Sequence, residues 1–214
     1  MKTMLVGCGF LGSLFAEEVN KHAYALHEPL TWLFVDGDSV EDRNIANQGF
    51  DYVAVGKNKA AVLAERAKKY AHQATALRKR ITKLPVWQAD FLVDAVDNIE
   101  TRQMLWREAI RTGLPLLHLG ISRGGTGLVS WTVPQQKLDT FPLSPVALLG
   151  REIPKDPDDA LPPCELIKFR SLGLQVASAG ATALFAALGL NGPERFDSWT
   201  AGSLHHSVLE VRSQ

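Results

Sequence analysis

Five short groups of glycine, acidic, amide and lysine residues stand in the first hundred positions, with types and spacing that can do chemistry. They are Gly7-Cys8-Gly9-Phe10-Leu11-Gly12, Asp36-Gly37-Asp38, Arg43-Asn44-Ile45-Ala46-Asn47-Gln48, Gly56-Lys57-Asn58-Lys59 and Asp97-Asn98. Glycines let a phosphate approach the backbone, a carboxylate binds ribose hydroxyls, and amide and lysine groups donate to phosphate oxygens. A further carboxylate can share a magnesium ion with those phosphates. The groups therefore favour a nucleoside triphosphate with magnesium over a nicotinamide dinucleotide.

The glycine group lies between an apolar run, 4–6, and a stretch whose apolar residues recur at helical spacing. This is a G-x-G-x-x-G turn between a strand and a helix. In such a turn Gly7 permits the tight bend, Gly9 admits a phosphate, and Gly12 lets helix and strand pack closely. Dehydrogenases, methyltransferases and adenylating enzymes all use this turn, so the residues after it must separate these classes.

Asp36 follows a second apolar run, 30–35, at the place where a parallel sheet presents an acid to a ribose. Lys59 opens the next helix, and Asp97 follows a later apolar run, 91–96. Ligands of open parallel sheets bind outside the carboxyl ends of the strands. We therefore expect these groups to converge on one crevice, which keeps a spare carboxylate for a magnesium ion shared with the phosphates.

Strand and helix signals alternate along the chain, which predicts an α/β fold. We expect a Rossmann-like, doubly wound, mostly parallel sheet with helices on both faces. Strands are expected at 4–6, 30–35, 91–96, 116–121 and 128–133, with a short one within 76–84. Helices are expected after the glycine turn and at 57–70, 99–112 and 172–190, and a final hairpin at 199–212.

The whole chain of 214 residues fits a single domain. Residues 1–133 form the expected nucleotide-binding core, and 164–214 a closing helix with C-terminal strands. The stretch between them, 134–163, is rich in proline and acidic residues, which build no packed face. We expect this stretch to be a crossover loop over the site, since loops of this length are usually functional or disordered.

Composition narrows the classes of partner. The 23 basic and 23 acidic residues cancel, which argues against a broad nucleic-acid surface. The only cysteines, Cys8 and Cys164, form no disulfide framework, and this suits a reducing cytoplasm. No signal peptide is expected, because 1–3 lead directly into a strand. The run 172–190 carries polar and small residues, so a buried helix is expected rather than a membrane span.

In this order the five groups resemble the ThiF/MoeB/HesA family of adenylyltransferases, relatives of the ubiquitin-activating enzymes. The stretches that carry the resemblance are VDGDSVEDRNIANQGF, VGKNKA and DAVDNIETR, within 4–133. The resemblance implies an enzyme that uses ATP and magnesium to attach AMP to a carboxylate. That carboxylate would be the C-terminus of a ubiquitin-like or sulfur-carrier protein, or of a peptide. The resemblance also implies a dimer, either of two copies or with a relative.

The resemblance assigns roles to single residues of this chain. Asp36 matches the ribose-binding acid, and Asn44 and Lys59 match phosphate contacts. Asp97 matches the magnesium ligand, and Asn98 is its neighbour in the site. The catalytic set is then Lys59, Asp97, Arg43 and Asn44. The nucleotide-binding set is Gly7, Gly9, Gly12, Asp36, Asp38, Asn47, Gln48, Lys59 and Asn98.

The chain departs from the family pattern in two places. The motif arginine is replaced by Asn47, and Arg43 is expected to supply charge from nearby in its stead. The paired zinc cysteines are missing, so zinc is not expected. Cys164, at the end of the crossover loop, is either an acceptor of the acyl group as a thioester or an inert remnant.

Other interpretations of these residues stay open. A non-catalytic subunit that pairs with an active relative, or a pseudoenzyme, would explain the replaced arginine. An NAD-dependent oxidoreductase would need only the glycine turn and Asp36. Asp97 and Asn98 would also serve as caps of the helix that follows. Arg102 is expected in a structural ion pair, and Cys8 in the packing of the turn.

Overall fold

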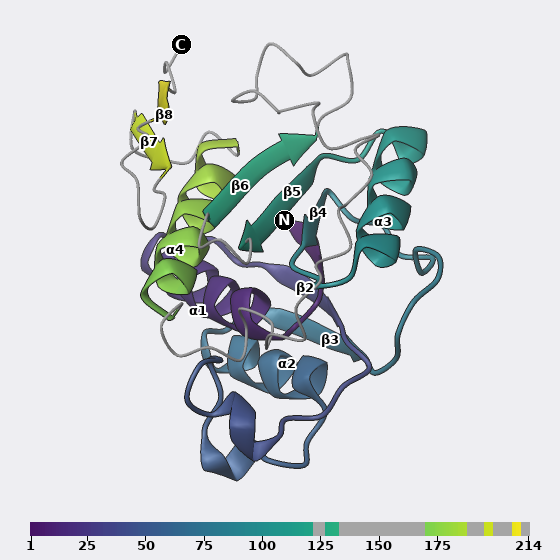
Figure 1. Ribbon diagram of the computed structural model, residues 1–214, viewed down its shortest axis with the longest axis vertical. Helices are drawn as coiled ribbons and strands as arrows, with labels where there is room; N and C mark the ends of the chain where they lie inside the picture. Colours follow the sequence, from purple (N-terminus) through teal and green to yellow (C-terminus); the bar gives the residue numbers. More distant parts are fainter. Residues whose placement is uncertain (122–126, 133–169, 188–194, 199–206, 211–214) are drawn as a thin grey trace, which may run out of the picture.

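The computed structural model describes residues 1–121, 127–132, 170–187, 195–198 and 207–210. Its centre is a six-stranded sheet with the order β3-β2-β1-β4-β5-β6 (Figure 1). All neighbouring strands pair in parallel except β5 and β6, which are antiparallel. The strands are β1 (Lys2–Val6), β2 (Thr31–Val35), β3 (Gln73–Leu77), β4 (Phe91–Asp94), β5 (Leu116–Ile121) and β6 (Gly127–Thr132).

Helices cover both faces of this sheet. They are α1 (Phe10–Ala25), α2 (Lys59–Lys69), α3 (Ile99–Thr112) and α4 (Arg170–Ala187), with short 3-10 turns η1 (Asp42–Asn44) and η2 (Tyr52–Ala54). Alternate residues of strands β1 to β5 pack into two cores, one on each face of the sheet. Leu5 packs in the core that contains α1, α2 and α4, and Met4 packs in the core that contains α3. The prediction of a mostly parallel Rossmann-like α/β fold is confirmed.

Local sequence explains where the helices next to the crevice begin and end. The Asn58 side chain accepts from Ala61 N at 3.1 Å and caps α2, so this helix begins at Lys59 rather than at 57 as expected. Asn98 caps α3 in the same way, accepting from Thr101 N at 2.8 Å. Gly113 ends α3 in the left-handed region at φ 70°. Amide N-caps and a C-terminal glycine are the usual boundary signals.

The third strand was predicted in the wrong place. It spans Gln73–Leu77 and pairs with β2, so the basic residues 78–80 lie beyond its carboxyl end instead of within it. The strand expected at 91–96 ends at Asp94, where the chain leaves the sheet to form the crevice. The final hairpin exists as β7 (Arg195–Ser198) and β8 (Ser207–Glu210), so its first strand lies before the expected range.

Two expectations concern residues outside the described part of the chain. They are the crossover loop at 134–163 and the role of Cys164. Among the described helices, none has the length and apolar character needed to cross a membrane.

Candidate functional site

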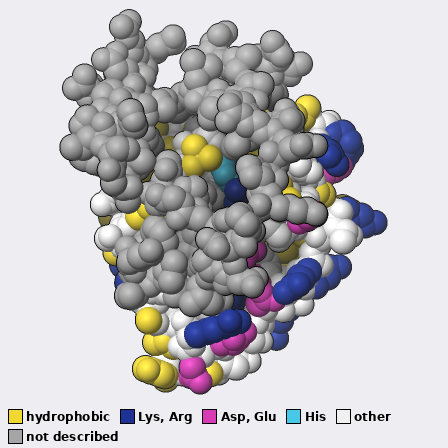
Figure 2. Space-filling view, in the orientation of Figure 1, with side chains coloured by type: hydrophobic (Ala, Val, Ile, Leu, Met, Phe, Trp, Pro, Cys, Tyr) yellow, Lys and Arg dark blue, Asp and Glu magenta, His cyan; other side chains and the backbone are white. Residues whose placement is uncertain are grey.

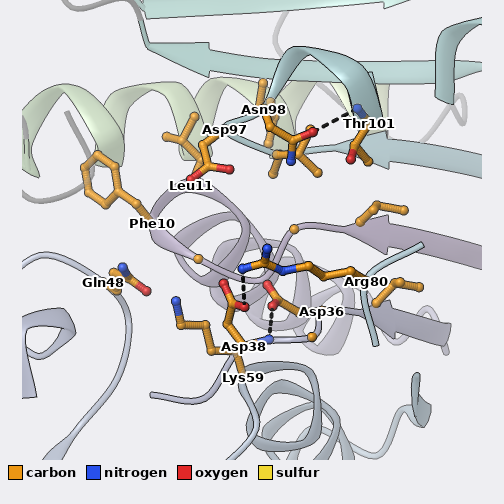
Figure 3. A pocket seen from close by; sticks show the side chains of 18 of the residues that line it. Phe10, Leu11, Asp36, Asp38, Gln48, Lys59, Arg80, Asp97, Asn98 and Thr101 are labelled. Carbon is orange, nitrogen blue, oxygen red and sulfur yellow. Dashed lines mark hydrogen bonds and ion pairs between the residues drawn. The ribbon is translucent and has the colours of Figure 1, made fainter. Parts of the chain in front are cut away.

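The carboxyl ends of β1, β2, β4 and β5 border one pocket with a volume of about 580 Å³, within the range of small-molecule sites. Figure 3 shows Asp97 and Asn98 on one side of it, and Asp36 and Lys59 on the other. Ten of the residues predicted from the sequence line the pocket: Gly7, Gly9, Asp36, Asp38, Arg43, Asn44, Gln48, Lys59, Asp97 and Asn98. Gly12 and Asn47 do not line it.

The three glycines of the turn do different work. Gly7 has φ +89°, and a Cβ there would lie 2.6 Å from the carbonyl oxygen of Ala95. A Cβ at Gly12 would collide with the carbonyl oxygen of Gly7. At Gly9 the nearest atom would be Oε1 of Gln48, at an ordinary 3.9 Å. The bend and the packing therefore require Gly7 and Gly12, whereas Gly9 leaves its backbone open to the pocket.

Asp36 ties the end of β2 to the glycine turn. Its Oδ2 accepts from Cys8 N at 2.7 Å, and its Oδ1 accepts from Asp38 N at 2.8 Å. Burial raises the pKa of Asp36 above its ordinary value, although these two N–H donors and the charge of Lys59 oppose the rise. Each carboxylate oxygen keeps a lone pair, so Asp36 can still accept from ribose hydroxyls.

Cys8 is fully buried behind this turn, and its Sγ donates to the carbonyl oxygen of Val35 at 3.8 Å. Burial raises the pKa of the Cys8 thiol well above its ordinary value, and the charge of Asp36 adds to the rise. The thiol is therefore protonated and part of the packing, as its place in the turn indicated.

Lys59 and Gln48 bring buried polar groups to the pocket. Lys59 is 8% exposed, and its backbone N–H donates to the carbonyl oxygen of Asp38 at 2.9 Å, which fixes the first turn of α2. Gln48 is 5% exposed, and its Oε1 has no hydrogen-bond partner among the described residues. Buried polar atoms nearly always have partners, so Gln48 fits a site that takes a polar ligand.

The segment 43–47, just before Gln48, is held by contacts with Glu41 and with Arg170. Asn44 Oδ1 accepts from Glu41 N at 2.9 Å, and Arg43 pairs with Glu41 at 2.7 Å. From the start of α4, Arg170 donates to the carbonyl oxygen of Asn47 at 2.7 Å. Arg170 lies 123 residues further along the chain, and no sequence signal connected it with this segment.

Asp97 and Asn98 were each expected either to cap α3 or to serve in the site, and the structure gives them different roles. Asn98 caps α3 with its side-chain oxygen, so the capping interpretation is right for this residue. Asp97 is exposed at the rim of the pocket, and no hydrogen bond or ion pair joins it to another residue in the described ranges. Its carboxylate therefore remains available to a cation.

Lys79 and Arg80 also line the pocket, and neither was predicted from the sequence. Arg80 pairs with Asp38 at 3.0 Å (Figure 3). The basic run after β3 could have indicated them, but it was assigned to the interior of the strand expected within 76–84. On the face drawn in Figure 2, described Lys and Arg side chains alternate with acidic ones instead of forming one basic surface.

A second missed group lies at the end of β4 and β5, where the buried Asp94 contacts both Arg102 and His118. The contact with Arg102 is the structural ion pair expected for that residue. No cluster of three or more His, Cys, Asp or Glu suited to a metal occurs in the part of the chain that the structure describes. A metal at Asp97 would therefore take its other ligands from substrate phosphates and water.

Known proteins resemble this chain in both sequence family and fold. No curated protein sequence matches it. The structure of E. coli MccB with ATP has a TM-score of 0.70 at 16% identity, over 98% of this chain and 64% of that one. E. coli MccB with MccA-N7isoASN has a TM-score of 0.71 at 15% identity, over the same shares. The chain thus spans less than two thirds of the length of these structures. The ThiF family model matches residues 1–141, well over half of the sequence, and the protein therefore belongs to the ThiF family.

Proposed function

We propose that this protein is an adenylyltransferase, which transfers AMP from ATP to a carboxylate and releases pyrophosphate. One observation carries the proposal: a single pocket gathers the glycine turn, Asp36, Lys59 and Asp97 at the carboxyl edge of the sheet. Membership of the ThiF family supports it, as does the likeness to MccB, whose structures were solved with ATP and with AMPCPP plus MccA.

The pocket residues suggest a division of labour. Asp36 accepts from the ribose hydroxyls, and the backbone at Gly9 approaches the phosphates at the N-terminus of α1. A carboxylate oxygen of the acyl substrate attacks the α-phosphorus, and the bond from that phosphorus to pyrophosphate breaks. Lys59, buried beside the pocket, offsets the negative charge that develops on the phosphates, with Asn44 and Arg43 nearby.

Asp97 fits the role of magnesium ligand, because it lines the pocket and no hydrogen bond or ion pair joins its carboxylate to another described residue. Magnesium typically takes one or two carboxylates together with phosphate oxygens. When bound, it would neutralise charge on the phosphates of ATP. Asn98 would contribute only its amide nitrogen, since its oxygen caps α3.

The acyl substrate is proposed to be the C-terminus of a ubiquitin-like or sulfur-carrier protein or of a peptide, and the place of action to be the cytoplasm. The enzyme is proposed to act as a dimer, of two copies or with a relative. Light scattering at micromolar concentration tests the assembly, since a particle of 23.5 kDa alone would contradict a homodimer.

A second candidate function is a nucleotide-binding subunit without catalysis. It is favoured by Asn47, which stands where the family motif has arginine, is 2% exposed, and does not line the pocket. The two candidates differ in turnover and not in binding, so only a rate measurement separates them.

We expect ATP–pyrophosphate exchange that depends on magnesium and on a carboxylate substrate, and we expect Asp97→Ala to abolish it. Removal of a charged group that holds a metal commonly costs several kcal/mol of transition-state stabilisation, or about a thousandfold in rate. Glu65→Ala is the matched control, since Glu65 is an exposed acid on α2 outside the pocket. Exchange that survives in Asp97→Ala would remove Asp97 from the mechanism, and nucleotide binding without any exchange would favour the non-catalytic subunit.

A further inference from the structure

A buried cluster at the carboxyl ends of β4 and β5 has no part in the function proposed above. Its centre is Asp94, whose side chain is 1% exposed. Asp94 Oδ1 accepts from Val96 N at 3.1 Å. Asp94 Oδ2 lies 2.8 Å from Nδ1 of His118 and 3.3 Å from Nε of Arg102. A carboxylate only accepts, so the proton on this ring nitrogen of His118 points at Asp94.

The other ring nitrogen of His118 is the unusual atom. His118 is 7% exposed, and its Nε2 is buried without a hydrogen-bond partner in the described part of the protein. Buried polar atoms without partners are rare in folded proteins and call for an explanation. Asp94 already fixes the orientation of the ring, so Nε2 is held in one direction.

Nε2 lies behind Gly120, which lines the pocket, while His118 itself is not a lining residue. A Cβ added at Gly120 would lie 3.1 Å from His118 Nε2 and 3.8 Å from Arg102 Nη1. Gly120 and Arg102 both line the pocket. Because Gly120 has no side chain, a ligand oxygen beside it can come within hydrogen-bond distance of Nε2 and close to Nη1.

The charges of the cluster select the kind of ligand. Arg102 always carries its charge, so its Nη1 only donates. An anionic oxygen is the strongest acceptor for this guanidinium, and it also accepts from Nε2 when that nitrogen carries a proton. A carboxylate fits and still leaves its second oxygen free to act as a nucleophile.

Position separates the carboxylate of the acyl substrate from a phosphate of ATP. The residues proposed to bind nucleotide and magnesium lie at the ends of β2, β1 and β4, and β5 is the next strand. Strands are spaced by roughly 4.8 Å, so Gly120 lies about 14 Å across the sheet from Asp36. The end of β5 therefore adjoins the metal-binding edge of the nucleotide site.

We infer that His118 Nε2 and Arg102 Nη1, beside Gly120, bind the carboxylate of the acyl substrate. The inference rests on the proposed adenylation and names the subsite that orients its second substrate. No covalent bond forms at the subsite. One carboxylate oxygen accepts from the two nitrogens, and the other oxygen is left to attack the α-phosphorus.

The test follows Nε2 of His118 by NMR in the full-length protein labelled with ¹⁵N-histidine. The probe is N-acetylglycine, a minimal acyl carboxylate, titrated with and without magnesium and a non-hydrolysable ATP analogue. N-acetylglycinamide, which is neutral and of the same shape, is the control. We expect the carboxylate to move the Nε2 resonance toward the protonated form, and the amide to leave it in place.

Gly120→Ala is the steric variant, because its Cβ fills the space beside Nε2 and keeps all three side chains of the cluster, with the His118 ring shifted by a few tenths of an ångström. We expect it to abolish the response to N-acetylglycine and to leave Mg-ATP affinity within twofold by calorimetry. His118→Gln, which can still donate to Asp94, serves as a second variant. It should raise the KM for the acyl substrate at least tenfold, with little change in the KM for ATP.

Three outcomes would overturn the inference. One is an Nε2 resonance that does not respond to 100 mM N-acetylglycine. Another is an equal response to the amide. The third is a tenfold loss of Mg-ATP affinity in Gly120→Ala, which would assign the subsite to a phosphate. Failure of the proposed function is seen separately, as wild-type protein that shows no ATP–pyrophosphate exchange with any carboxylate substrate.

Discussion

Gln48 places a buried amide oxygen beside Gly9 without a hydrogen-bond partner among the described residues. Such an atom costs about 1–3 kcal/mol when it stays unsatisfied. The cost is tolerable where a ligand supplies the partner, and the open backbone of Gly9 lies at the same spot. Because this oxygen only accepts, a donor on the ligand such as a hydroxyl group would satisfy it, whereas a phosphate oxygen would not. These two residues therefore mark a polar part of the pocket more sharply than their sequence positions did.

Asp36 gives the site a predicted dependence on pH. Because burial raises its pKa, the folded protein holds this proton more tightly than the unfolded chain does. The contribution of Asp36 to stability therefore falls as pH rises from its ordinary pKa through the raised one. Nucleotide affinity moves the opposite way, since only the ionised carboxylate accepts from both ribose hydroxyls while holding the glycine turn.

We therefore expect Mg-ATP affinity to increase as pH rises through the raised pKa of Asp36, and then to level off. Asp36→Asn should lack this step and bind about 1–3 kcal/mol more weakly at neutral pH. Calorimetric titrations between pH 4 and pH 7 measure both effects. Asp51→Asn is the control, because Asp51 pairs with Arg66 outside the pocket. The same step in Asp36→Asn would assign the titration to another group.

At the scale of elements, different glycines of the turn serve folding and ligand binding. Gly12 faces the carbonyl oxygen of Gly7 within the fold, whereas Gly9 faces the pocket. Gly12→Ala should destabilise the protein by about 1–3 kcal/mol or more, because the added methyl forces β1 and α1 apart. Gly9→Ala should keep the stability and lose nucleotide affinity. Urea unfolding and calorimetry on the pair check this, and equal stability losses would contradict the division.

The sequence predicted the elements whose signals are local. The helix 99–112 was placed correctly, because Asn98 caps it and Gly113 ends it. The third strand was misplaced, because an edge strand that is half exposed shows no clear alternation and its carboxyl end carries basic residues. Contacts between distant segments have no local signal. This is why Arg170 and the pair of Asp94 with His118, 24 residues apart, were not foreseen.

At the scale of the whole molecule, the pocket joins the two cores. Its walls come from α1 and α2, which pack on one face of the sheet, and from the N-terminus of α3, which packs on the other. A ligand that contacts all of them holds both layers against the sheet. Its binding free energy should therefore appear in the cooperative unfolding of the whole domain rather than in one loop.

We expect Mg-ATP to raise the midpoint of thermal unfolding more than NAD does. A ligand at a hundred times its Kd stabilises the folded state by about 2.7 kcal/mol. For a domain of this size each kcal/mol is worth about 2–4 °C, so the expected rise is roughly 5–10 °C.

AMP, which keeps the ribose and one phosphate, should give a smaller rise. Removal of magnesium should reduce the effect of ATP in the wild type and leave that of AMP unchanged, because AMP does not need the metal proposed at Asp97. A rise with NAD alone would contradict the nucleotide site proposed here and favour an oxidoreductase.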